Sequence, residues 1–543
     1  MDDLVQKYIQ PYIKQFNLQM ETLTPVAIRS GDVYSPLTDY HIENDKFYFI
    51  DTDRLSADLI GKQWIDDFER KVEEYTFQGG DENKTPKQKN NFLRDFLKEK
   101  GAQIQIQEYL KPNPLKSTLR ETDKWVQLRT TIKTNEHAYI PGSSIKGAIK
   151  TAVIYCWLTE TDEGKHDLDV FVEGIKEKVN SNAKKIVDFK KNKHLLKKDK
   201  SDDELKEIAW KLSEINIKIQ SLYQDLAKDL DHFEKNISTK IFGTTTTKNL
   251  YDSSTRFKIL DTQLLSDKNL FIGMLNKRYR ADDKLLDGKK KDFSPSLQEF
   301  IGKDTTTSFQ ITIPQFKLDW EKIDENGYFA QMLWDEKGLK KILSAINQFS
   351  HDYLDYEIEK LNGFETFNEG ECFRKSNLDS LLQQFTELQK LNLKPNESIM
   401  CLGFGKSYFA NTVTLALRKA FPEEFVNMIK ILTKNRHPRA KEFPFSYYCV
   451  AIQDRDYPLG WVRIVETKKS YTKEEFESGI PILGTIVKLD KPHSRVMIVI
   501  EGIEEEYNVI GKDKYEKSKS DLIEGKECLV YRHSNRNVSF NPQ

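Results

Sequence analysis

The sequence predicts an α+β protein, because two kinds of hydrophobic pattern alternate along it. Runs in which apolar and β-branched residues alternate with polar ones, as in half-buried strands, occur near both ends of the chain and in its middle. Between them, residues 160–240 are charged and poor in glycine, with apolar residues three and four positions apart. A strand, a glycine-rich turn and a helix are expected twice, at residues 137–158 and 397–421. The repetition indicates two related α+β halves.

The composition narrows the class of protein. The 543 residues suffice for about two to four domains, since a domain usually has about 100–200 residues. Lys and Arg total 84 against 85 Asp and Glu, so an anionic partner must be met by local clusters. No apolar run approaches the roughly 20 residues of a membrane-spanning helix, and the opening MDDLVQKY does not resemble a signal peptide. We expect a soluble, cytoplasmic protein that contacts no membrane.

Cysteine usage indicates neither a disulfide framework nor a zinc site. The chain has five cysteines, an odd number, and they lie far apart without a CxxC pair. They are Cys156, Cys372, Cys401, Cys449 and Cys528. We therefore expect reduced, mostly buried thiols, no metal and no cofactor.

The first part of the chain predicts strands joined by polar turns. Residues 17–28 alternate as a strand that is broken at Thr24-Pro25, and a hairpin follows around Asn44. Residues 77–91 are polar and predict an exposed loop. Further strands are expected near residues 104–109 and 125–132, leading into the first glycine-rich turn.

Residues 160–240 predict a helical hairpin inserted into a domain. The apolar positions repeat with the period of a coiled-coil seam for about three heptads. They are Leu205, Ile208, Leu212, Ile215, Ile219, Leu222 and Leu226. A helix over residues 170–189 is the expected partner, because so short a stripe more often packs within one chain than between chains.

Strands return after the insertion, and the chain ends in a β-rich segment. Strands are expected at residues 256–265, 270–279 and 307–314, and helices at residues 336–361 and 378–391. Beyond Lys468, alternating strands predict a small β-barrel, of which an OB-like module is one form among several. The expected domains are residues 1–255, with the insertion at about 160–240, residues 256–470 and residues 471–543.

The first glycine-rich turn, PGSSIKG, has the features of an anion site. A helix starting near Ser144 would present unpaired backbone N–H groups and the positive end of its dipole, and glycine would let a phosphate approach closely. Two lysines four positions apart would lie on one face of this helix. The alternative is that a serine caps a buried helix and both lysines are solvated. The candidate contacts are Gly142, Ser143, Ser144, Lys146, Gly147 and Lys150.

The second glycine-rich turn invites comparison with a nucleotide-binding P-loop but lacks its spacing. Met400 occupies the position where that loop needs its first glycine. A single strand of RNA fits better, because a base can stack on an aromatic ring while the backbone approaches the glycines. The candidate contacts are Gly403, Phe404, Gly405, Lys406 and Ser407.

A third turn, formed by Arg29, Ser30 and Gly31, follows the first strand. Its arginine could reach a phosphate, although a lone arginine in a loop is usually only solvated. No motif in the sequence combines the residues of a known catalytic site. His41 and His137 are the only histidines near the glycine turns, and a lone histidine beside a strand is more often structural than a general base.

Four segments together resemble a known family. LTPVAIRSGDVYSPLTDYHI, YIPGSSIKGAIKTA, LGFGKSYFANTV and PLGWVRI resemble, in this order, the motifs of RAMP proteins of type III CRISPR interference complexes. The resemblance runs from Leu23 to Ile464 and is strongest to the large subunit that caps the crRNA 3′-side end of the type III-A Csm complex.

This resemblance implies two ferredoxin-like (RRM-like) domains whose glycine turns lie against the guide RNA. The implied role is structural: to close the filament against neighbouring RAMP subunits, both the repeat backbone and the small subunits, with target RNA adjacent. It also implies protection of the 3′ part of the crRNA, help in its maturation in antiviral defence, and recruitment of host nucleases. Sister subunits cleave target RNA with an aspartate in a loop resembling I-D-[NS]-P-V. Here Tyr34 occupies that position, so we expect no enzyme activity.

Two rival functions remain open at the level of sequence. One is a metal-independent RAMP endoribonuclease that processes the crRNA precursor, with His41 or His137 as general base. The other is a protein-only scaffold in which the helical hairpin makes the functional contacts.

Overall fold

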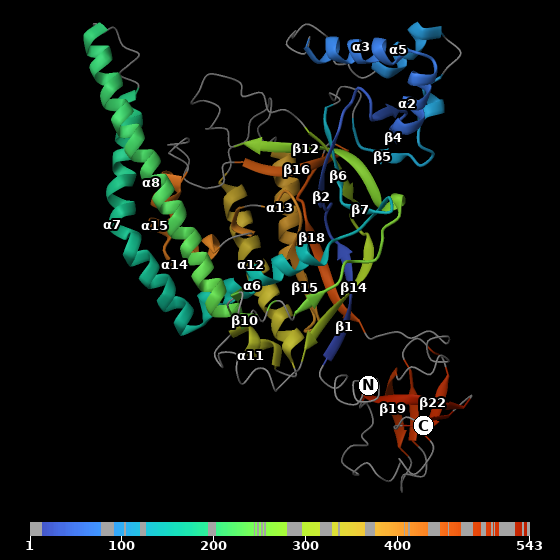
Figure 1. The fold of residues 1–543 in the computed structure, drawn as a ribbon. Helices are drawn as coiled ribbons and strands as arrows, with labels where there is room; N and C mark the ends of the chain where they lie inside the picture. The colour runs from blue at the N-terminus through green and yellow to red at the C-terminus, as the bar shows by residue number, and fades with distance from the viewer. Residues whose placement is uncertain are drawn as a thin grey trace. The chain divides into compact units, whose positions relative to one another are not determined.

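The computed structural model describes residues 13–77, 92–101, 105–119, 126–193, 202–243, 245–246, 249–250, 254, 257–279, 296–314, 328–334, 337–363, 375–406, 408–410, 413–432, 446–453, 455–467, 482–489, 496–500, 503, 505–509, 527–534 and 537–539. The chain forms two compact units. One holds residues 19–465, and the other holds residues 466–543 together with 15–18. The mixture of helices and strands confirms the α+β class (Figure 1).

A nine-stranded sheet has the order β2-β6-β13-β12-β5-β4-β3, with β16 added beside β12 and β17 beside β16. Its strands are β2 (Arg29–Tyr34), β3 (Tyr40–Glu43), β4 (Lys46–Phe49), β5 (Leu115–Ser117), β6 (Leu128–Thr131), β12 (Leu270–Tyr279), β13 (Ser296–Ile301), β16 (Ser446–Ile452) and β17 (Arg455–Tyr457). The predicted hairpin is confirmed: β3 and β4 pair across Asn44 and Asp45, which both have positive φ. Such a pair suits the tight turn of a hairpin.

A five-stranded sheet has the order β11-β14-β1-β18-β15. Its strands are β1 (Ile13–Thr22), β11 (Lys258–Ile259), β14 (Thr306–Pro314), β15 (Glu397–Cys401) and β18 (Trp461–Thr467). Two short pairs complete the strands of this unit: β7 (Lys133–Thr134) with β8 (His137–Ala138), and β9 (Thr245–Thr246) with β10 (Asn249–Leu250).

Both larger sheets combine strands from before and after residue 255. In the nine-stranded sheet β6 lies beside β13, and in the five-stranded sheet β1 lies between β14 and β18. Residues 1–255 and 256–470 therefore share their sheets and do not form separate compact units. Strand order of this kind depends on pairings between distant segments, which hydrophobic periodicity does not report.

Helices pack on the five-stranded sheet and on one another. They are α6 (Gly142–Glu160), α11 (Tyr328–Trp334), α12 (Gly338–Asn362), α13 (Lys375–Gln389), α14 (Thr414–Ala420) and α15 (Pro422–Leu432). The long α12 packs against α6, α13 and β15. The ring of Tyr353 stacks on Trp461 of β18 at 5.6 Å, and Ser350 donates a hydrogen bond to the Ile399 carbonyl at 2.7 Å. These contacts join α12 to two neighbouring strands.

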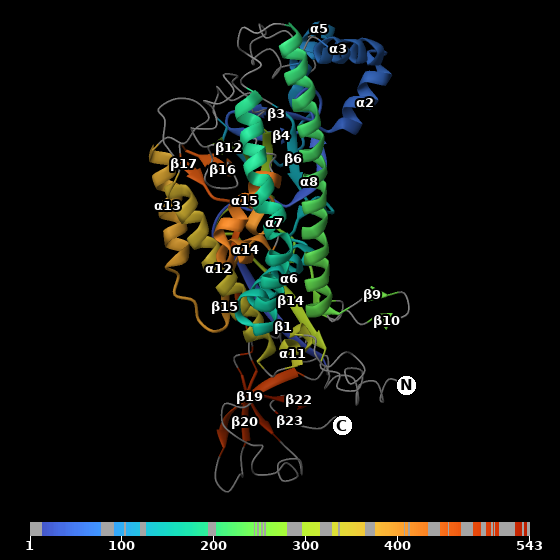
Figure 2. The same ribbon diagram turned by 90° about the vertical axis from the view of Figure 1, so that its left-hand side faces the viewer.

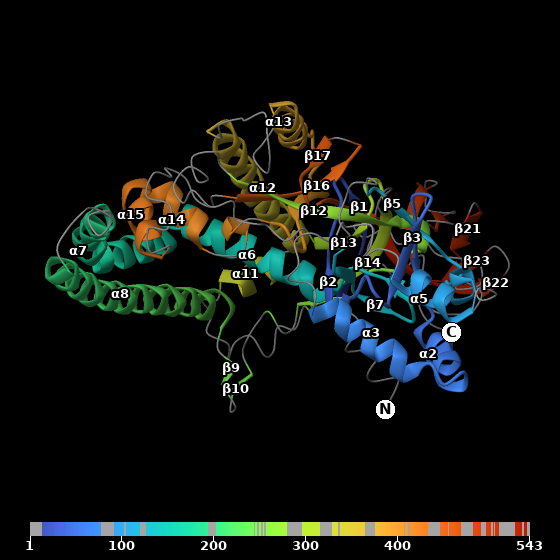
Figure 3. The same ribbon diagram turned by 90° about the horizontal axis from the view of Figure 1, so that it is seen from above.

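The predicted helical hairpin is confirmed as α7 (Asp162–Lys193) and α8 (Asp202–Phe242), which run side by side (Figures 2 and 3). The rings of Phe171 and Phe233 stack at 4.3 Å between the two helices. Leu226 of the heptad stripe is buried, whereas the side chains of Leu205, Ile208, Leu212, Ile215 and Ile219 lie outside the described residues. The hairpin also packs against α15, where Asn427 donates a hydrogen bond to Asn180 at 2.9 Å.

A small helical cluster follows β4. It consists of α2 (Thr52–Gly61), α3 (Ile65–Phe77), α5 (Phe92–Gly101) and the 3₁₀ helix η3 (Ile106–Tyr109). The strand predicted at residues 104–109 is wrong, because this segment forms η3 with Ile106 and Tyr109 buried three positions apart. A capping box between Gln105 and Glu108 stabilises the turn. The predicted polar loop falls almost entirely outside the described residues.

Two other boundaries differ from the prediction. The segment 256–265 contains only β11, a strand of two residues, followed by a stretch up to the 3₁₀ helix η5 (Asp267–Asn269). The helix predicted from Lys406 begins at Thr414, after the short 3₁₀ helix η6 (Tyr408–Ala410).

The smaller unit is a closed barrel, as the β-rich end of the sequence predicted. Its strands are β19 (Ile482–Leu489), β20 (Val496–Val499), β21 (Glu506–Val509), β22 (Glu527–Ser534) and β23 (Asn537–Ser539). They close in the order β19-β20-β21-β23-β22, with β21 and β23 parallel. Five strands around a core that includes Ile498 and Tyr507 match the architecture of an OB-like module. In the part of the chain that the structure describes, no helix is both long and apolar enough to cross a membrane.

Candidate nucleic-acid interface

The third turn, at residues 29–31, and the second glycine-rich turn, at residues 403–407, meet in the structure, although more than half of the chain lies between them. The guanidinium carbon of Arg29 lies 3.3 Å from the centre of the Phe404 ring. The backbone N–H of Phe404 donates a hydrogen bond to the Ala27 carbonyl at 2.7 Å. Two of the three turns singled out in the sequence therefore form a single site.

The glycines of the second turn are needed for packing against protein. Gly403 has φ +76°, and a Cβ there would lie 2.3 Å from the Ala27 carbonyl oxygen. Gly405 has φ +94°, and a Cβ there would lie 2.5 Å from the side chain of Leu459. Both positions require glycine for conformation and for space. The loop is thus held between the 25–28 segment and Leu459, and this packing accounts for its glycines without RNA.

The ring of Phe404 is not open on both sides. Arg29 covers one face, and the ring of Tyr448 approaches edge-on at 5.2 Å with an interplanar angle of 61°. A base cannot stack on the face that Arg29 covers, so the predicted stacking needs revision there. The outer plane of a guanidinium group can itself stack with a base.

Arg29 and Lys406 are half-buried cations. Burial, followed by repulsion from Arg129, lowers the pKa of Arg29 to about 10, so it stays protonated at neutral pH. Burial also lowers the pKa of Lys406. Among the described residues neither cation makes an ion pair with a carboxylate. Partly desolvated cations without a counterion are a favourable place for a phosphate.

Strand residues that the sequence did not point to complete this surface. The Nε of Arg29 donates to Gln298 at 2.9 Å, and Gln298 donates to the Arg129 carbonyl at 3.0 Å. Lys277 of β12 lies opposite Tyr448 of β16 in the sheet register, with its ammonium 5.3 Å from the Tyr448 ring. We define the basic-aromatic patch as Arg29, Arg129, Lys277, Phe404, Lys406 and Tyr448. The sequence predicted a strand over residues 270–279, which contains Lys277, but the β12–β16 pairing could not be read from it.

The first glycine-rich turn is capped by protein. Helix α6 starts at Gly142, two residues before the predicted Ser144, and the Gly142 N–H donates to the Asp261 carboxylate at 2.8 Å. A Cβ at Gly142 would lie 2.2 Å from the Ile259 carbonyl oxygen. The carboxylate of Asp261 already occupies the positive end of the helix dipole, so a phosphate is disfavoured at this point.

The two lysines of α6 have different surroundings. The Lys150 ammonium lies 3.4 Å from the Ser254 hydroxyl and 4.4 Å from the centre of the Phe242 ring, so this side chain is directed into the protein. Lys146 is half-buried, whereas Ser143 and Gly147 are exposed. The Ser144 N–H donates to the Pro141 carbonyl at 2.9 Å. Of this turn, Ser143 and Gly147 are exposed, and Ser144 and Lys146 are partly accessible.

Ser30 and Gly31 lie at an irregularity in β2. The pairing of β2 with β6 shifts between Arg29 and Val33, and Gly31 has φ +101° with open space where a Cβ would lie. Ser30 forms a hydrogen bond with the Thr130 hydroxyl at 3.0 Å. Ser407 lies outside the described residues.

The two histidines do not form a catalytic pair. His41 of β3 is only 3% exposed, and burial, together with Arg94, outweighs Glu43 and lowers its pKa. His137 is exposed in β8. A buried imidazole cannot reach the 2′-hydroxyl of a bound RNA, which leaves His137 as the accessible candidate.

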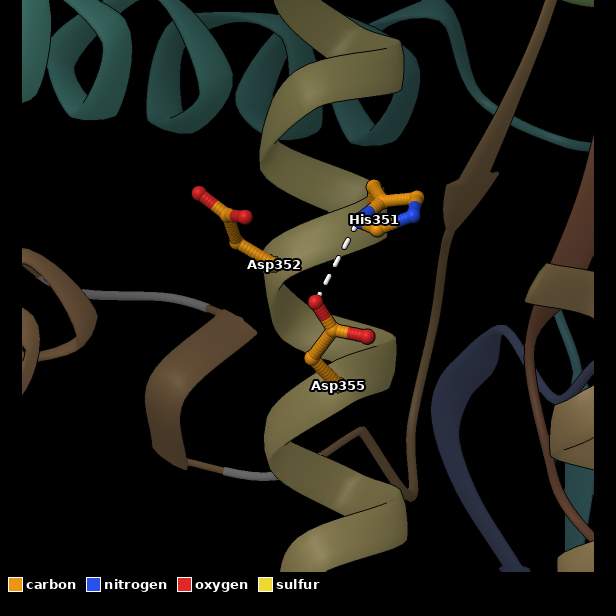
Figure 4. Close-up of side chains that lie close together, drawn as sticks. All are labelled: His351, Asp352 and Asp355. Atoms are coloured by element: carbon orange, nitrogen blue, oxygen red, sulfur yellow. Dashed lines mark ion pairs between the residues drawn. The ribbon is translucent and has the colours of Figure 1, made fainter.

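Among the residues that the structure describes, one group of side chains has the composition of a metal site, namely His351, Asp352 and Asp355 on α12 (Figure 4). The Asp352 carboxylate accepts hydrogen bonds from the Tyr155 hydroxyl at 2.5 Å and the Lys419 ammonium at 2.7 Å. His351 lies 3.3 Å from Asp355. Because Asp352 is already neutralised by Lys419, we interpret the group as a surface ionic network.

Comparisons with known proteins give a consistent result. A model of the RAMP superfamily matches residues 19–409. The chain is similar to "CRISPR system Cms protein Csm5" of Methanocaldococcus jannaschii, with 25% identity over 345 residues that cover 62% of this chain and 69% of the relative. A protein of the same description from Streptococcus thermophilus is 26% identical over 152 residues, which cover 26% of this chain and 38% of the relative.

Solved structures resemble the chain in fold. A chain of the Csm–crRNA–target RNA ternary complex of a type III-A CRISPR-Cas system superposes with a TM-score of 0.53 and 18% identity, covering 84% of this chain and 100% of that chain. The crystal structure of T. onnurineus Csm5 superposes with a TM-score of 0.50 and 16% identity, covering 82% of this chain and 99% of that chain. At these identities the likeness is one of fold alone.

Proposed function

The chain belongs to the RAMP superfamily, and from this premise we propose that it is a non-catalytic, RNA-binding subunit of a type III-A CRISPR (Csm) complex. The names of its relatives, Csm5 from two organisms, support this assignment. So does its similarity in fold to a chain of a Csm complex that contains crRNA and target RNA.

The observation that carries the proposal is the stack of Arg29 on Phe404, together with the half-buried Lys406 two residues further along the same loop. The guanidinium and ammonium groups are partly desolvated, and in the described residues no carboxylate pairs with either. A phosphate would supply the missing negative charge, and the guanidinium plane would supply a stacking surface. Contacts of this kind are made to the RNA backbone, which is the same for every sequence. The affinity should therefore depend on the salt concentration much more than on the RNA sequence.

Within the complex, the proposed role is to cap the filament, to bind and protect the 3′ part of the crRNA, and to assist crRNA maturation and assembly. Its partners would be crRNA, adjacent target RNA and neighbouring RAMP subunits in the cytoplasm. Recruitment of host nucleases depends on the resemblance alone.

The absence of an aspartate at position 34 argues against target cleavage by this subunit. Tyr34 stands where sister subunits carry their catalytic carboxylate, and burial followed by the charge of Asp32 raises its pKa. A tyrosine held protonated cannot act as that carboxylate does. The rival ribonuclease function would depend on the exposed His137, and incubation of the protein with repeat RNA in EDTA tests it. Cyclic-phosphate products that vanish in His137→Ala would establish the enzyme.

Salt-dependent RNA binding tests the proposal directly. We would measure fluorescence anisotropy of a labelled single-stranded RNA with the wild-type protein and with Arg29→Ala and Lys406→Glu variants. Removal of one cation that binds a phosphate should lower the slope of log K against log salt by about 0.7. Lys303→Glu is the matched control, because Lys303 is an exposed lysine in the turn between β13 and β14. Equal binding by all four proteins would contradict the assignment and favour the protein-only scaffold.

A further inference from the structure

A cavity of about 610 Å³ opens beside the basic-aromatic patch, on the residues of β2 that follow Arg29. Its walls come from β2, the end of β4, the segment before β5, and the β6–β7 connection. A volume of this size is typical of sites for small organic ligands. The resemblance described above aligns Tyr34, one of its lining residues, with the catalytic aspartate of sister subunits, but it assigns no ligand to the cavity.

The charged residues of the cavity disfavour an anionic ligand. Asp32, Asp39, Glu136 and Asp267 line it, against the lysines Lys111 and Lys133. Both lysines are neutralised: Lys111 pairs with Glu136 at 3.1 Å, and Lys133 pairs with the buried Glu299 at 2.7 Å. A phosphate would therefore meet net negative charge, whereas a ligand rich in hydrogen-bond donors would be favoured.

Two polar groups of the wall remain available to such a ligand. Asp39 is committed, because it accepts hydrogen bonds from the Ser35 N–H at 2.6 Å and the Thr38 hydroxyl at 2.7 Å. By contrast, within the described residues no hydrogen bond or ion pair involves the Asp32 carboxylate or the Tyr34 hydroxyl. The Tyr34 ring meets Phe49 edge-on at 5.4 Å, which makes one wall aromatic.

The cavity lies at the edge of the sheet that an RNA strand held at Arg29 would pass. Strand β2 is at one end of the nine-stranded sheet, and its irregularity lies between Arg29 and Val33. A backbone held at Arg29 would pass this edge, where Ser30 and Asp32 line the cavity. A nucleotide at this point could turn its base into the cavity while its phosphate stays at the cationic patch.

We propose that the cavity receives one unstacked base of the bound RNA and selects bases that carry an exocyclic amino group over uracil. The amino group of cytosine donates to the Asp32 carboxylate, whereas uracil carries at the same ring position a carbonyl oxygen that the carboxylate repels. The Tyr34 hydroxyl donates to a ring nitrogen or carbonyl of the base. This inference rests on the proposed function, because it assigns one base contact to an otherwise backbone-directed interface.

The test compares oligocytidine with oligouridine, two pyrimidine strands of equal charge. With the full-length protein, we expect oligocytidine to bind about tenfold more tightly, the contribution of a hydrogen bond to a charged group. Asp32→Ala should bring the ratio close to one, because it removes both the acceptor for the cytosine amino group and the repulsion of the uracil carbonyl, and Tyr34→Phe should lower the ratio. Asp53→Ala, an exposed carboxylate of α2 that does not line the cavity, should keep the preference.

A second arm separates this inference from RNA binding itself. Saturation-transfer NMR with free cytidine and uridine reports base recognition without any strand. Cytidine signals that disappear in Asp32→Ala support the pocket even if no oligonucleotide binds, a result that would defeat only the proposed function. Equal binding of both strands by the wild type, a preference that survives in both variants, or no cytidine signal with the wild type would each overturn the inference.

Discussion

The ammonium group of Lys360 lies 2.6 Å from the carboxylate of Glu357, and neither side chain has any exposed surface. The two residues are three positions apart on α12. The rings of Tyr356 and Tyr447 lie 5.5 and 5.0 Å from the ammonium. A complete ion pair is thus buried on α12, the helix that packs against β15 and contacts β18 through Tyr353 and Trp461.

Removing one partner of this pair should be more harmful than removing both. Lys360→Met leaves a buried carboxylate without its cation, and we expect a loss of about 3–5 kcal/mol in the free energy of unfolding. The double variant Lys360→Met, Glu357→Leu should lose less, because no unpaired charge remains. Urea denaturation of the three proteins measures the difference. A double variant less stable than the single one would show that the pair itself is strongly stabilising.

The ion pair between Glu397 and Arg463 should make stability depend on pH. Burial opposes ionisation of Glu397, but hydrogen bonds from Arg463 at 2.7 Å and from the Lys394 N–H outweigh it and lower its pKa below the ordinary value of 4.5. A lowered pKa in the folded state gives stability that is present above pH 4.5 and is lost as the pH falls further.

Arg463→Met should therefore reduce the urea midpoint most at neutral pH, and the difference from the wild type should shrink below about pH 4. Lys303→Met serves as a matched control on an exposed turn. A difference that stays constant from pH 7 to pH 4 would show that Arg463 acts through packing and not through this charge.

Substitutions of the two lysines of α6 should have different effects: loss of Lys146 should affect RNA binding, and loss of Lys150 should affect stability. Lys146→Glu combined with Lys406→Glu should give purified complexes whose guide RNA is shortened or lost at its 3′ end, while the isolated protein keeps its fold. Lys150→Glu should instead lower the melting temperature, because the Lys150 side chain packs on Phe242. Denaturing gels of the bound RNA and thermal melts check the two outcomes. Full-length guide in the double variant would contradict the role of both turns.

Local features were predictable from the sequence, and long-range ones were not. The β3–β4 hairpin, the α7–α8 hairpin and the terminal barrel follow from patterns within short stretches. Strand β12 pairs with the next strand, β13, but also with β16 and β5, which lie far away in the chain. For this reason Lys277 was not recognised as a site residue, although its strand was predicted, and no strand was predicted around Tyr448. A resemblance of motifs indicated the family, but it did not reveal how the two halves share their sheets.

The same limit explains why glycines were assigned to RNA. Sequence alone does not distinguish a glycine that admits a ligand from one that admits another part of the protein. At Gly142 and Gly403 the nearest atoms are backbone carbonyl oxygens of β11 and of the 25–28 segment. Gly147 and Gly31, by contrast, have open space around them.

This contrast leads to opposite expectations for two glycine-to-alanine substitutions. Gly403→Ala must tolerate φ +76° and a Cβ placed 2.3 Å from the Ala27 carbonyl oxygen. The conformation alone costs about 1–2 kcal/mol, and the collision should lift Phe404 away from Arg29 and weaken RNA binding. Gly147→Ala introduces a methyl group into open space within α6, so it should stabilise the protein by about 0.5–1 kcal/mol. Denaturation midpoints and RNA anisotropy of both variants test these expectations. A Gly403→Ala protein with wild-type stability would show that the loop can accommodate a Cβ at this position, contrary to the packing against Ala27.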